Sequence, residues 1–366
     1  MHIEIQKGEL VKKLELIARV ATKHLTLPVL QCVYIRTEKD KVFFAGTNLE
    51  VSITAVVEAK IVEDGVVAVP SALLLQTIQL LPENSVVLKT EGESLIVEAR
   101  GSSAKINTFS PQEFPSIPEL VGPVQTLDGA LFALGLRTAA FAVSQSTIKP
   151  ELGSICIQQQ KEHTLTFIAT DSFRLVEKIV SQKHFTLENS LLIPQKNALE
   201  IARVLEVIDR NPECIVGEGQ VAFRFPDGTY MTTRLTEGSF PDYTQIIPKE
   251  FVTHVTVLTS DLLHALKMTN VFANKFLQVS FEIDSTSKSL IARSDSGELG
   301  KTTEHIPATI EGNDLTLSFN QRYISDPLTH IAGESIILHF AGIGRPMVME
   351  SVSEKTMRYL VMPMNK

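Results

Sequence analysis

The hexapeptide Ala45-Gly46-Thr47-Asn48-Leu49-Glu50 recurs in the chain as Ala169-Thr170-Asp171-Ser172-Phe173-Arg174, and more faintly as Ala292-Arg293-Ser294-Asp295-Ser296-Gly297. Thr47, Thr170 and Ser294 are 123 and 124 residues apart. A second anchor, Pro70, Pro194 and Asn320, precedes a helix-like run each time and keeps nearly the same period. Two anchors that share one domain-sized period predict three similar domains in tandem.

The boundaries between the repeats are marked by Phe-Pro pairs. Phe114-Pro115 and Phe240-Pro241 are 126 residues apart. A unit of about 120 residues is long enough to close its own hydrophobic core. The sequence therefore predicts three domains, which comprise residues 1–121, 122–248 and 249–366.

Each repeat has the pattern of a strand followed by an amphipathic helix, further strands and a second helix, which predicts an α+β fold. In the first repeat the strand is expected at residues 3–6 and the helix at residues 9–21. The second helices are expected at residues 71–81, 195–207 and 321–331. The last of these contains Pro327, which either breaks the helix or marks a shifted first turn. The predicted apolar stripes are Leu10, Leu14, Ile17, Ala18 and Ala21, then Leu131, Leu134, Ala139 and Ala142, then Leu262, Leu263, Leu266 and Val271.

The composition is that of an ordinary globular chain, with 44% hydrophobic and 21% charged residues and a net charge of −8. The N-terminus lacks the apolar core of a signal peptide, and no apolar run approaches the ~18 residues that span a bilayer. A cytoplasmic protein with no membrane partner is expected. Cys32, Cys156 and Cys214 are too scattered for a disulfide framework, and the first two occupy nearly equivalent repeat positions as buried residues. The nine histidines suggest no metal site, and no cofactor is predicted.

Motifs for catalysis are weak. Gly300-Lys301-Thr302 resembles the end of a phosphate-binding loop, but position 295, where that loop needs glycine, is Asp295. If the protein is an enzyme, the alternative hypothesis is a nucleotide hydrolase that uses Gly300-Lys301-Thr302. Asp295-Ser296-Gly297 is more typical of a polar turn than of a serine nucleophile. No catalytic residue is predicted, because threefold repetition without a repeated catalytic group favours a scaffold.

Several motifs in this order resemble the bacterial DNA polymerase III beta subunits, which are sliding clamps. They are Leu25-Thr26-Leu27-Pro28-Val29-Leu30, Gly46-Thr47-Asn48-Leu49-Glu50, Ala169-Thr170-Asp171 with Arg174-Leu175, Gly238-Ser239-Phe240-Pro241-Asp242-Tyr243 and Val361-Met362-Pro363-Met364. The resemblance spans the whole chain.

That resemblance implies a non-enzymatic ring, in which each domain packs two helices on β-sheets and two chains close head to tail around duplex DNA. Such a ring tethers the replicative polymerase through weak, sequence-independent contacts that permit sliding. The alternative architecture among clamps is a trimer of two-domain chains. The three repeats of this chain argue against it.

The distribution of charge agrees with a DNA-facing set of helices. The windows 8–23, 70–82, 128–143, 195–208, 260–275 and 320–332 carry ten basic residues, including Lys12, Lys13 and Arg203, and seven acidic residues. These windows sum to +3 and the remainder to −11. The DNA contacts implied by the resemblance are Lys23, His24, Lys149, Lys196 and Arg322, and the implied dimer interface contains Lys105, Ile106, Asn107, Val271 and Phe272.

The resemblance also implies a docking pocket between the second and third domains. It would receive a motif close to Gln-Leu-x-Leu-Phe from the DNA polymerase III catalytic subunit, the clamp loader and repair proteins. Its implied wall is Leu152, Thr170, Ser172, Phe173, Arg174, Leu175, Pro241, Ile246, Leu360, Met362, Pro363 and Met364. The family commonly has Gly-His where this chain has Ser172-Phe173, so the preferred peptide is expected to differ.

Overall fold

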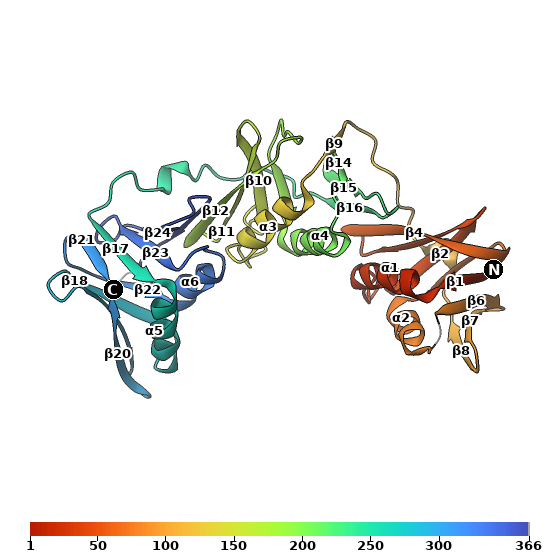
Figure 1. The fold of residues 1–366 in the computed structure, drawn as a ribbon, viewed down its shortest axis with the longest axis horizontal. Coiled ribbons are helices and arrows are strands. Elements are labelled where there is room, and N and C mark those ends of the chain that lie inside the picture. The colour runs from red at the N-terminus through yellow and green to blue at the C-terminus, as the bar shows by residue number, and fades with distance from the viewer. Residues whose placement is uncertain (83, 365–366) are drawn as a thin grey trace. The chain divides into compact units, whose positions relative to one another are not determined.

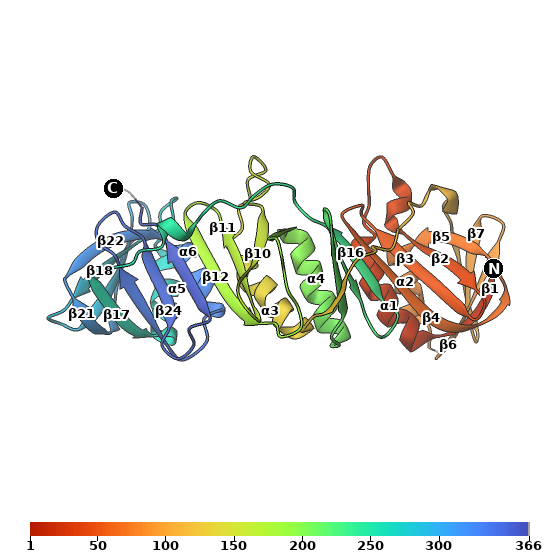
Figure 2. The ribbon, with the colours of Figure 1, turned by 90° about the horizontal axis from the view of Figure 1, so that it is seen from above.

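The computed structural model describes residues 1–82 and 84–364, and Asn365 and Lys366 of the third predicted domain lie outside them (Figures 1 and 2). The chain forms two compact units. Unit 1 comprises Met1–Ala130 and Arg203–Leu235, and unit 2 comprises Leu131–Ala202 and Thr236–Lys366. Both combine α-helices with antiparallel sheets, which confirms the predicted α+β class.

The order of elements repeats three times along the described chain: a strand, a helix, strands, a second helix and three closing strands. The first repeat contains β1 (His2–Gln6), α1 (Lys7–Val20), β2 (Cys32–Glu38), β3 (Lys41–Thr47), β4 (Val51–Glu63), β5 (Val66–Pro70), α2 (Ser71–Leu80), β6 (Ser85–Glu91), β7 (Ser94–Ala99) and β8 (Ser102–Asn107). The second contains β9 (Val124–Thr126), α3 (Gly129–Ala140), β10 (Ser154–Lys161), β11 (Thr164–Thr170), β12 (Arg174–Ser181), β13 (Leu191–Pro194), α4 (Gln195–Ile208), β14 (Glu213–Gly217), β15 (Gln220–Arg224) and β16 (Tyr230–Arg234).

The third repeat follows the same plan with one additional strand. It contains β17 (Thr253–Leu258), α5 (Thr259–Val271), β18 (Gln278–Asp284), β19 (Ser289–Ser296), β20 (Gly300–Pro307), β21 (Thr309–Gly312), β22 (Leu315–Asn320), α6 (Gln321–Ser325), β23 (Ser335–Phe340), β24 (Met347–Ser351) and β25 (Met357–Val361). A 3-10 turn, Asp326–Thr329, directly follows α6. Pro327 therefore ends the α-helix after five residues, and the chain continues as this tighter turn.

Strand pairing joins neighbouring repeats in the same manner within each unit. In unit 1, β4 of the first repeat pairs with β16, the last strand of the second repeat. In unit 2, β12 of the second repeat pairs with β25, the last strand of the third repeat. Figure 2 shows β12 and β24 on one face of unit 2. Each junction therefore extends a sheet from one repeat into the next.

The first helix of each repeat packs on the sheets through a narrow apolar face. In α1 the expected residues Leu10, Leu14 and Ile17 are fully buried. In α3 the prediction for Leu134 was wrong, because its side chain is 46% exposed. Gly135 lies against the ring of Phe167, where a Cβ atom would come within 2.5 Å, so the helix turns this face to the sheet. The prediction that Val271 belongs to the buried stripe of α5 was also wrong, because its side chain is 64% exposed.

The repeat anchors match closely in the first two repeats. Thr47 Oγ1 donates to Val51 O (3.0 Å) and accepts from Leu49 N (3.0 Å). Thr170 Oγ1 donates to Arg174 O (2.6 Å) and accepts from Ser172 N (3.1 Å). The two threonines therefore make the same pair of hydrogen bonds within their turns.

The third anchor is shifted by one residue from the expected position. Ala45 pairs with Tyr34 and Ile168 with Cys156, and the residue at the same place in the third repeat is Arg293, which pairs with Ser280. Asp295, not Ser294, therefore corresponds to Thr47. Ser294 instead donates to Phe272 O (3.0 Å) at the end of α5, because β19 runs directly into a hairpin with β20.

The three cysteines are buried and free, as expected. Burial raises the pKa of the Cys32 thiol to about 12 and that of the Cys156 thiol to about 11. Their predicted equivalence was off by two residues. Cys32 pairs with Pro70, and Ser154, not Cys156, pairs with Pro194.

Candidate functional site

Unit 2 contains an apolar cavity of about 330 Å³, lined by Phe173, Asn320, Tyr323, Met362, Pro363 and Met364. It lies where the turn after β11, the start of α6 and the segment after β25 come together. Met362 N donates to Phe173 O (2.8 Å), and Met364 N donates to Ser318 O (2.7 Å). These two bonds hold the segment after β25 against the rest of the site.

The turn between β11 and β12 presents Phe173 to solvent. Asp171 Oδ1 accepts from Phe173 N (2.9 Å) and from Arg174 N (3.0 Å). Ser172 adopts a φ of +77°, a left-handed conformation that is uncommon for a residue other than glycine. The Phe173 side chain is 61% exposed. A large aromatic ring at the mouth of an apolar cavity is available for contact with a ligand.

Arg174 holds the aromatic ring of Tyr323, which also lines the cavity. Its guanidinium donates to Asp171 Oδ2 (3.0 Å), to Asp326 Oδ2 (2.5 Å) and to Phe141 O (2.8 Å). The same group lies 4.5 Å from the centre of the Tyr323 ring, within the range of a cation–π contact. Burial disfavours the charged form, but the Asp326 hydrogen bond and nearby negative charge outweigh it and raise the pKa of Arg174. Arg174 therefore stays cationic and positions Tyr323.

Four of the twelve residues expected in the pocket wall line the cavity, namely Phe173, Met362, Pro363 and Met364. Leu175 and Leu360 are buried in a core cluster with Cys156 and Ile168, and Met362 packs against that cluster. Arg174 supports the wall from behind. Leu152 and Thr170 are buried, whereas Ser172, Pro241 and Ile246 are exposed and do not line this cavity.

Two lining residues, Asn320 and Tyr323, were not predicted. Asn320 caps α6 by accepting from Arg322 N (3.0 Å), and Tyr323 lies one helical turn further on. The repeat anchor had already marked Asn320 as a helix start. That signal placed Asn320 at a helix start, but it gave no indication that the following turn meets the segment after β25.

The five residues predicted to contact DNA are all exposed. Lys196 and Arg322 each stand at the second position of a helix, α4 and α6. The corresponding residue of α2 is Ala72, and α2 (Ser71–Leu80) contains no basic residue. Among the described residues, no carboxylate pairs with Lys23, Lys149, Lys196 or Arg322. Each of these cations is therefore available to a phosphate.

One helix cation counted toward the positive surplus is not available. Lys13 of α1 is only 6% exposed. Its Nζ forms an ion pair with Asp227 and donates to Thr229 Oγ1 (2.8 Å). Lys13 was counted in the positive surplus of the helices expected to face DNA, but its ammonium is buried in an ion pair inside unit 1 and does not contribute to an exposed positive surface.

The residues predicted at a dimer interface lie on one unpaired strand edge, that of β8, and at the end of α5, which is close to a second unpaired edge, that of β20. Lys105, Ile106 and Asn107 belong to β8, which within the described chain pairs only with β7. Within the described chain, β20 likewise pairs only with β19. Phe272 is half-buried close to Gly300 at the start of β20, and Val271 is exposed beside it.

The possible phosphate-binding motif does not form a loop. Gly300, Lys301 and Thr302 lie in β20, and the Lys301 ammonium pairs with Asp295 at 2.7 Å. An extended strand cannot wrap phosphate oxygens with successive backbone amides. Across residues 1–82 and 84–364, no group of three or more His, Cys, Asp or Glu is arranged to hold a metal ion.

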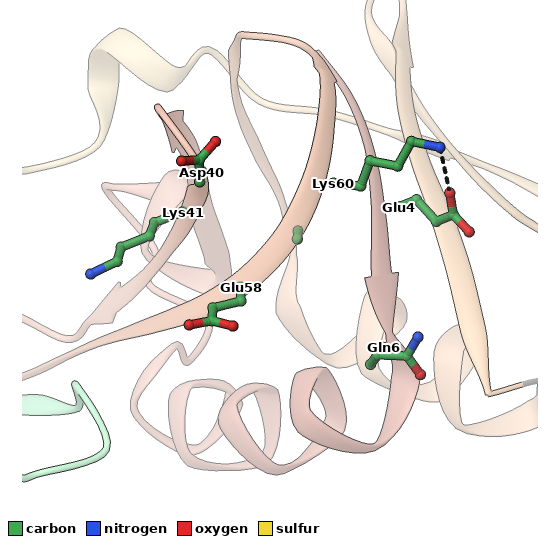
Figure 3. A pocket seen from close by; sticks show the side chains of 7 residues that line it. Glu4, Gln6, Asp40, Lys41, Glu58 and Lys60 are labelled. Atoms are coloured by element: carbon green, nitrogen blue, oxygen red, sulfur yellow. Dashed lines mark ion pairs between the residues drawn. The ribbon is translucent and has the colours of Figure 1, made fainter.

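A second, polar depression lies on unit 1 (Figure 3). Its volume is about 890 Å³, and its lining includes Glu4, Gln6, Glu58 and Lys60. Lys60 pairs with Glu4 at 3.6 Å, and the other side chains point apart rather than toward one centre. It has no convergent set of groups for binding or catalysis. Of the helices described, none is long and apolar enough to cross a membrane.

Comparison with known proteins gives one family for the whole chain. Models of the N-terminal, central and C-terminal domains of the DNA polymerase III beta subunit match residues 1–118, 126–242 and 244–365. The beta sliding clamp of Bacillus subtilis is 26% identical, with 99% of each chain covered. The beta sliding clamp homolog GriR of Streptomyces muensis is 25% identical over the same shares.

Solved structures agree with this assignment. A crystal structure of the DNA polymerase sliding clamp from Bacillus subtilis superposes with a TM-score of 0.92 at 25% identity, and covers 100% of this chain and 99% of that one. A sliding clamp from Pseudomonas aeruginosa, bound to griselimycin, has a TM-score of 0.93 at 24% identity, with both chains fully covered. The similarity to the Pseudomonas aeruginosa clamp, at 24% identity, supports only the assignment of the fold.

Proposed function

Because this chain belongs to the DNA polymerase III beta-subunit family, a family of non-enzymatic processivity factors, we propose that it encircles duplex DNA and tethers the replicative polymerase. The observation that carries this proposal is the ordered match of three clamp domains along the chain. A replication clamp works in the bacterial cytoplasm, and the proposal includes that location for this protein.

Ring closure by two chains is supported by the way the repeats already join. β4 pairs with β16, and β12 pairs with β25, so in each case a central strand meets the last strand of the following repeat. The corresponding strands still without such a partner are β20 in the third repeat and β8 in the first. Pairing β20 of one chain with β8 of a second chain completes the pattern, and two such junctions close a ring of six domains. Closure also covers two exposed strand edges.

DNA binding rests on exposed basic side chains. Sequence-independent association is driven by neutralising phosphates, and a ring needs only weak contacts because it is held topologically. Lys23, His24, Lys149, Lys196 and Arg322 supply these contacts in this proposal. All five are exposed, and they come from all three repeats.

Partner docking is assigned to the cavity beside Phe173. Ligand pockets of about 300 to 1,000 Å³ usually combine apolar walls with a few polar groups, and a cavity of about 330 Å³ with Asn320 at its edge fits that description. Met362 and Met364 are flexible and polarizable, so they can adapt to related peptides. The DNA polymerase III catalytic subunit and the clamp loader would each insert an apolar motif close to Gln-Leu-x-Leu-Phe here.

The experiment is fluorescence anisotropy with a labelled Gln-Leu-Asp-Leu-Phe peptide, titrated with the wild type and with a chain that ends at Val361. We expect micromolar binding by the wild type, on the order of −8 kcal/mol, and loss of binding by the shortened chain. Undiminished binding by the shortened chain would contradict the assignment of the cavity.

A further inference from the structure

Two histidines on neighbouring strands of unit 2 are bonded to each other. β17 and β23 pair antiparallel with His254 opposite His339, so both side chains leave the same face of the sheet. Their Nδ1 atoms lie 2.7 Å apart. A hydrogen bond needs one donor and one acceptor, so one Nδ1 carries a proton and the other does not.

The bond between the rings tolerates one positive charge but not two. A neutral pair forms it, and so does a pair in which one ring is protonated at both nitrogens while the other accepts at Nδ1. Once both rings are protonated, both Nδ1 atoms are donors and two like charges face each other. Uptake of a proton by the second ring therefore separates the rings.

The charges around the pair balance a first proton better than a second. Glu350 Oε2 on β24 lies 3.9 Å from His339 Nε2, the nitrogen outside the bond. The same carboxylate already pairs with Lys355 at 3.6 Å and with Arg358 at 2.9 Å. The other charged side chains on elements beside the pair are Glu311 of β21, which stands opposite His254, and Lys249 and Glu250 just before β17, all exposed. Exposed carboxylates are screened by water, so they offset a second charge only weakly.

The net effect on His339 favours the uncharged ring. Burial lowers its pKa, Glu350 raises it, and the positive charges of His254, Lys355 and Arg358 lower it, so that the pKa lies below its usual value. A histidine whose pKa is lower in the folded state than in the unfolded state stabilises the fold above the unfolded pKa, about 6.5. This stabilisation is lost as the pH falls through the folded pKa.

Phe251 links the pair to the strap, the segment of residues 240–252 that joins the second repeat to the third. The centre of the Phe251 ring lies 5.1 Å from that of His339 and 5.9 Å from that of His254. The ring also packs against the apolar cluster that contains Tyr243. The histidine pair therefore supports the end of the strap that is nearest β17.

The other end of the strap is held by a group that does not titrate near neutral pH. Tyr243 is buried and donates its hydroxyl to Glu177 Oε1 (2.8 Å), and Gln160 Nε2 donates to the same hydroxyl (2.8 Å). Burial and the neighbouring Glu177 raise the pKa of Tyr243. Mild acidification therefore changes the support at Phe251 and leaves the anchor at Tyr243 in place.

We propose that His254 and His339 form a proton-sensitive latch for the end of the strap. Near neutral pH the bonded pair supports Phe251. When the pH falls and both rings take up protons, the rings separate, Phe251 loses their support, and the end of the strap opens. The latch lies wholly within unit 2 and does not depend on the proposed function.

NMR of the histidine ring nitrogens in the full-length protein tests the pair itself. At about pH 7.5 we expect one of the two rings to carry a proton on Nδ1 and the other to have a bare Nδ1. The variants His254→Gln and His339→Gln assign the two signals. A bare Nδ1 on both rings would overturn the proposal.

Hydrogen exchange of the Val252 amide tests the opening of the strap. This amide follows Phe251 directly and donates to Phe340 O (2.8 Å). After correction for intrinsic exchange, its protection should fall about tenfold between about pH 7.5 and pH 5. The Arg234 amide of unit 1, which donates to Glu50 O (2.9 Å), should keep its protection over this range.

Three variants give this measurement its controls. His254→Gln and His339→Gln should each abolish the pH dependence at Val252, because the remaining ring takes up a proton without facing a second charge. His184→Gln, at an exposed histidine of unit 2, should keep the wild-type fall. The proposal is contradicted by unchanged protection of Val252 in the wild type, by an equal fall at the Val252 and Arg234 amides, or by a wild-type fall in both His254→Gln and His339→Gln.

Discussion

At the scale of single residues, Phe173 is the side chain on which docking depends most. It stands at the cavity mouth and is 61% exposed, and buried aromatic anchors are the usual hot spots of peptide interfaces. Phe173→Ala should weaken the Gln-Leu-Asp-Leu-Phe peptide by roughly 30-fold, about 2 kcal/mol. Glu50→Ala is the matched control, since Glu50 holds the same place in the equivalent turn of unit 1. Equal affinity of the Phe173→Ala protein and the wild type would remove Phe173 from the site.

Lys13 and Asp227 should make part of the stability depend on pH. Burial tends to raise the pKa of Asp227, but hydrogen bonds from Lys13 and Thr229 outweigh it, so the pKa is lowered. A carboxyl group whose pKa is lower in the folded state than in the unfolded state stabilises the fold at pH values above its unfolded pKa, about 3.9. This stabilisation is lost as the pH falls through the folded pKa.

Lys13→Met should therefore lower the free energy of unfolding at pH 7 and flatten its fall between about pH 5 and pH 3. Urea unfolding of both proteins across this range measures the difference. Parallel curves for the two proteins would show that this pair does not set the acid sensitivity.

At the scale of elements, the two equivalent turns allow a paired test. Thr47 and Thr170 make the same two hydrogen bonds, so Thr47→Val and Thr170→Val should each destabilise the fold by about 1 to 3 kcal/mol. Only Thr170→Val should also weaken peptide binding, because only its turn carries Phe173. Equal loss of binding in both variants would mean that the effect is global rather than local.

The sequence predicted the triplication and most elements because periodicity and turn residues act locally. The predicted ends of α1, α2 and α4 agree with the observed ends within two residues. Apolar spacing and the residue before each helix determine these ends. It misassigned the buried face of α3, where contact of Gly135 with Phe167 outweighs the leucine pattern. It also missed Tyr323, because a wall built from segments about 150 residues apart leaves no local signal.

At the scale of the whole molecule, the cations of α4 and α6 should govern the salt dependence of DNA binding. Each phosphate contact contributes about −0.9 to the slope of log K against log salt. Lys196→Glu with Arg322→Glu should therefore reduce the magnitude of that slope by at least about 2. Titration with duplex DNA at several salt concentrations provides the measurement, and an unchanged slope would mean that other residues meet the phosphates.

Ring closure is the central claim, and analytical ultracentrifugation of the wild-type protein tests it most directly. The chain has a mass of 40.4 kDa, so two chains joined through β8 and β20 should sediment at about 81 kDa. Val271→Asp, which places a charge beside that junction, should sediment at the mass of one chain. Val207→Asp, at a similarly exposed valine near the end of α4, should remain a dimer. A wild-type protein that sediments as a single chain at micromolar concentration would contradict the account.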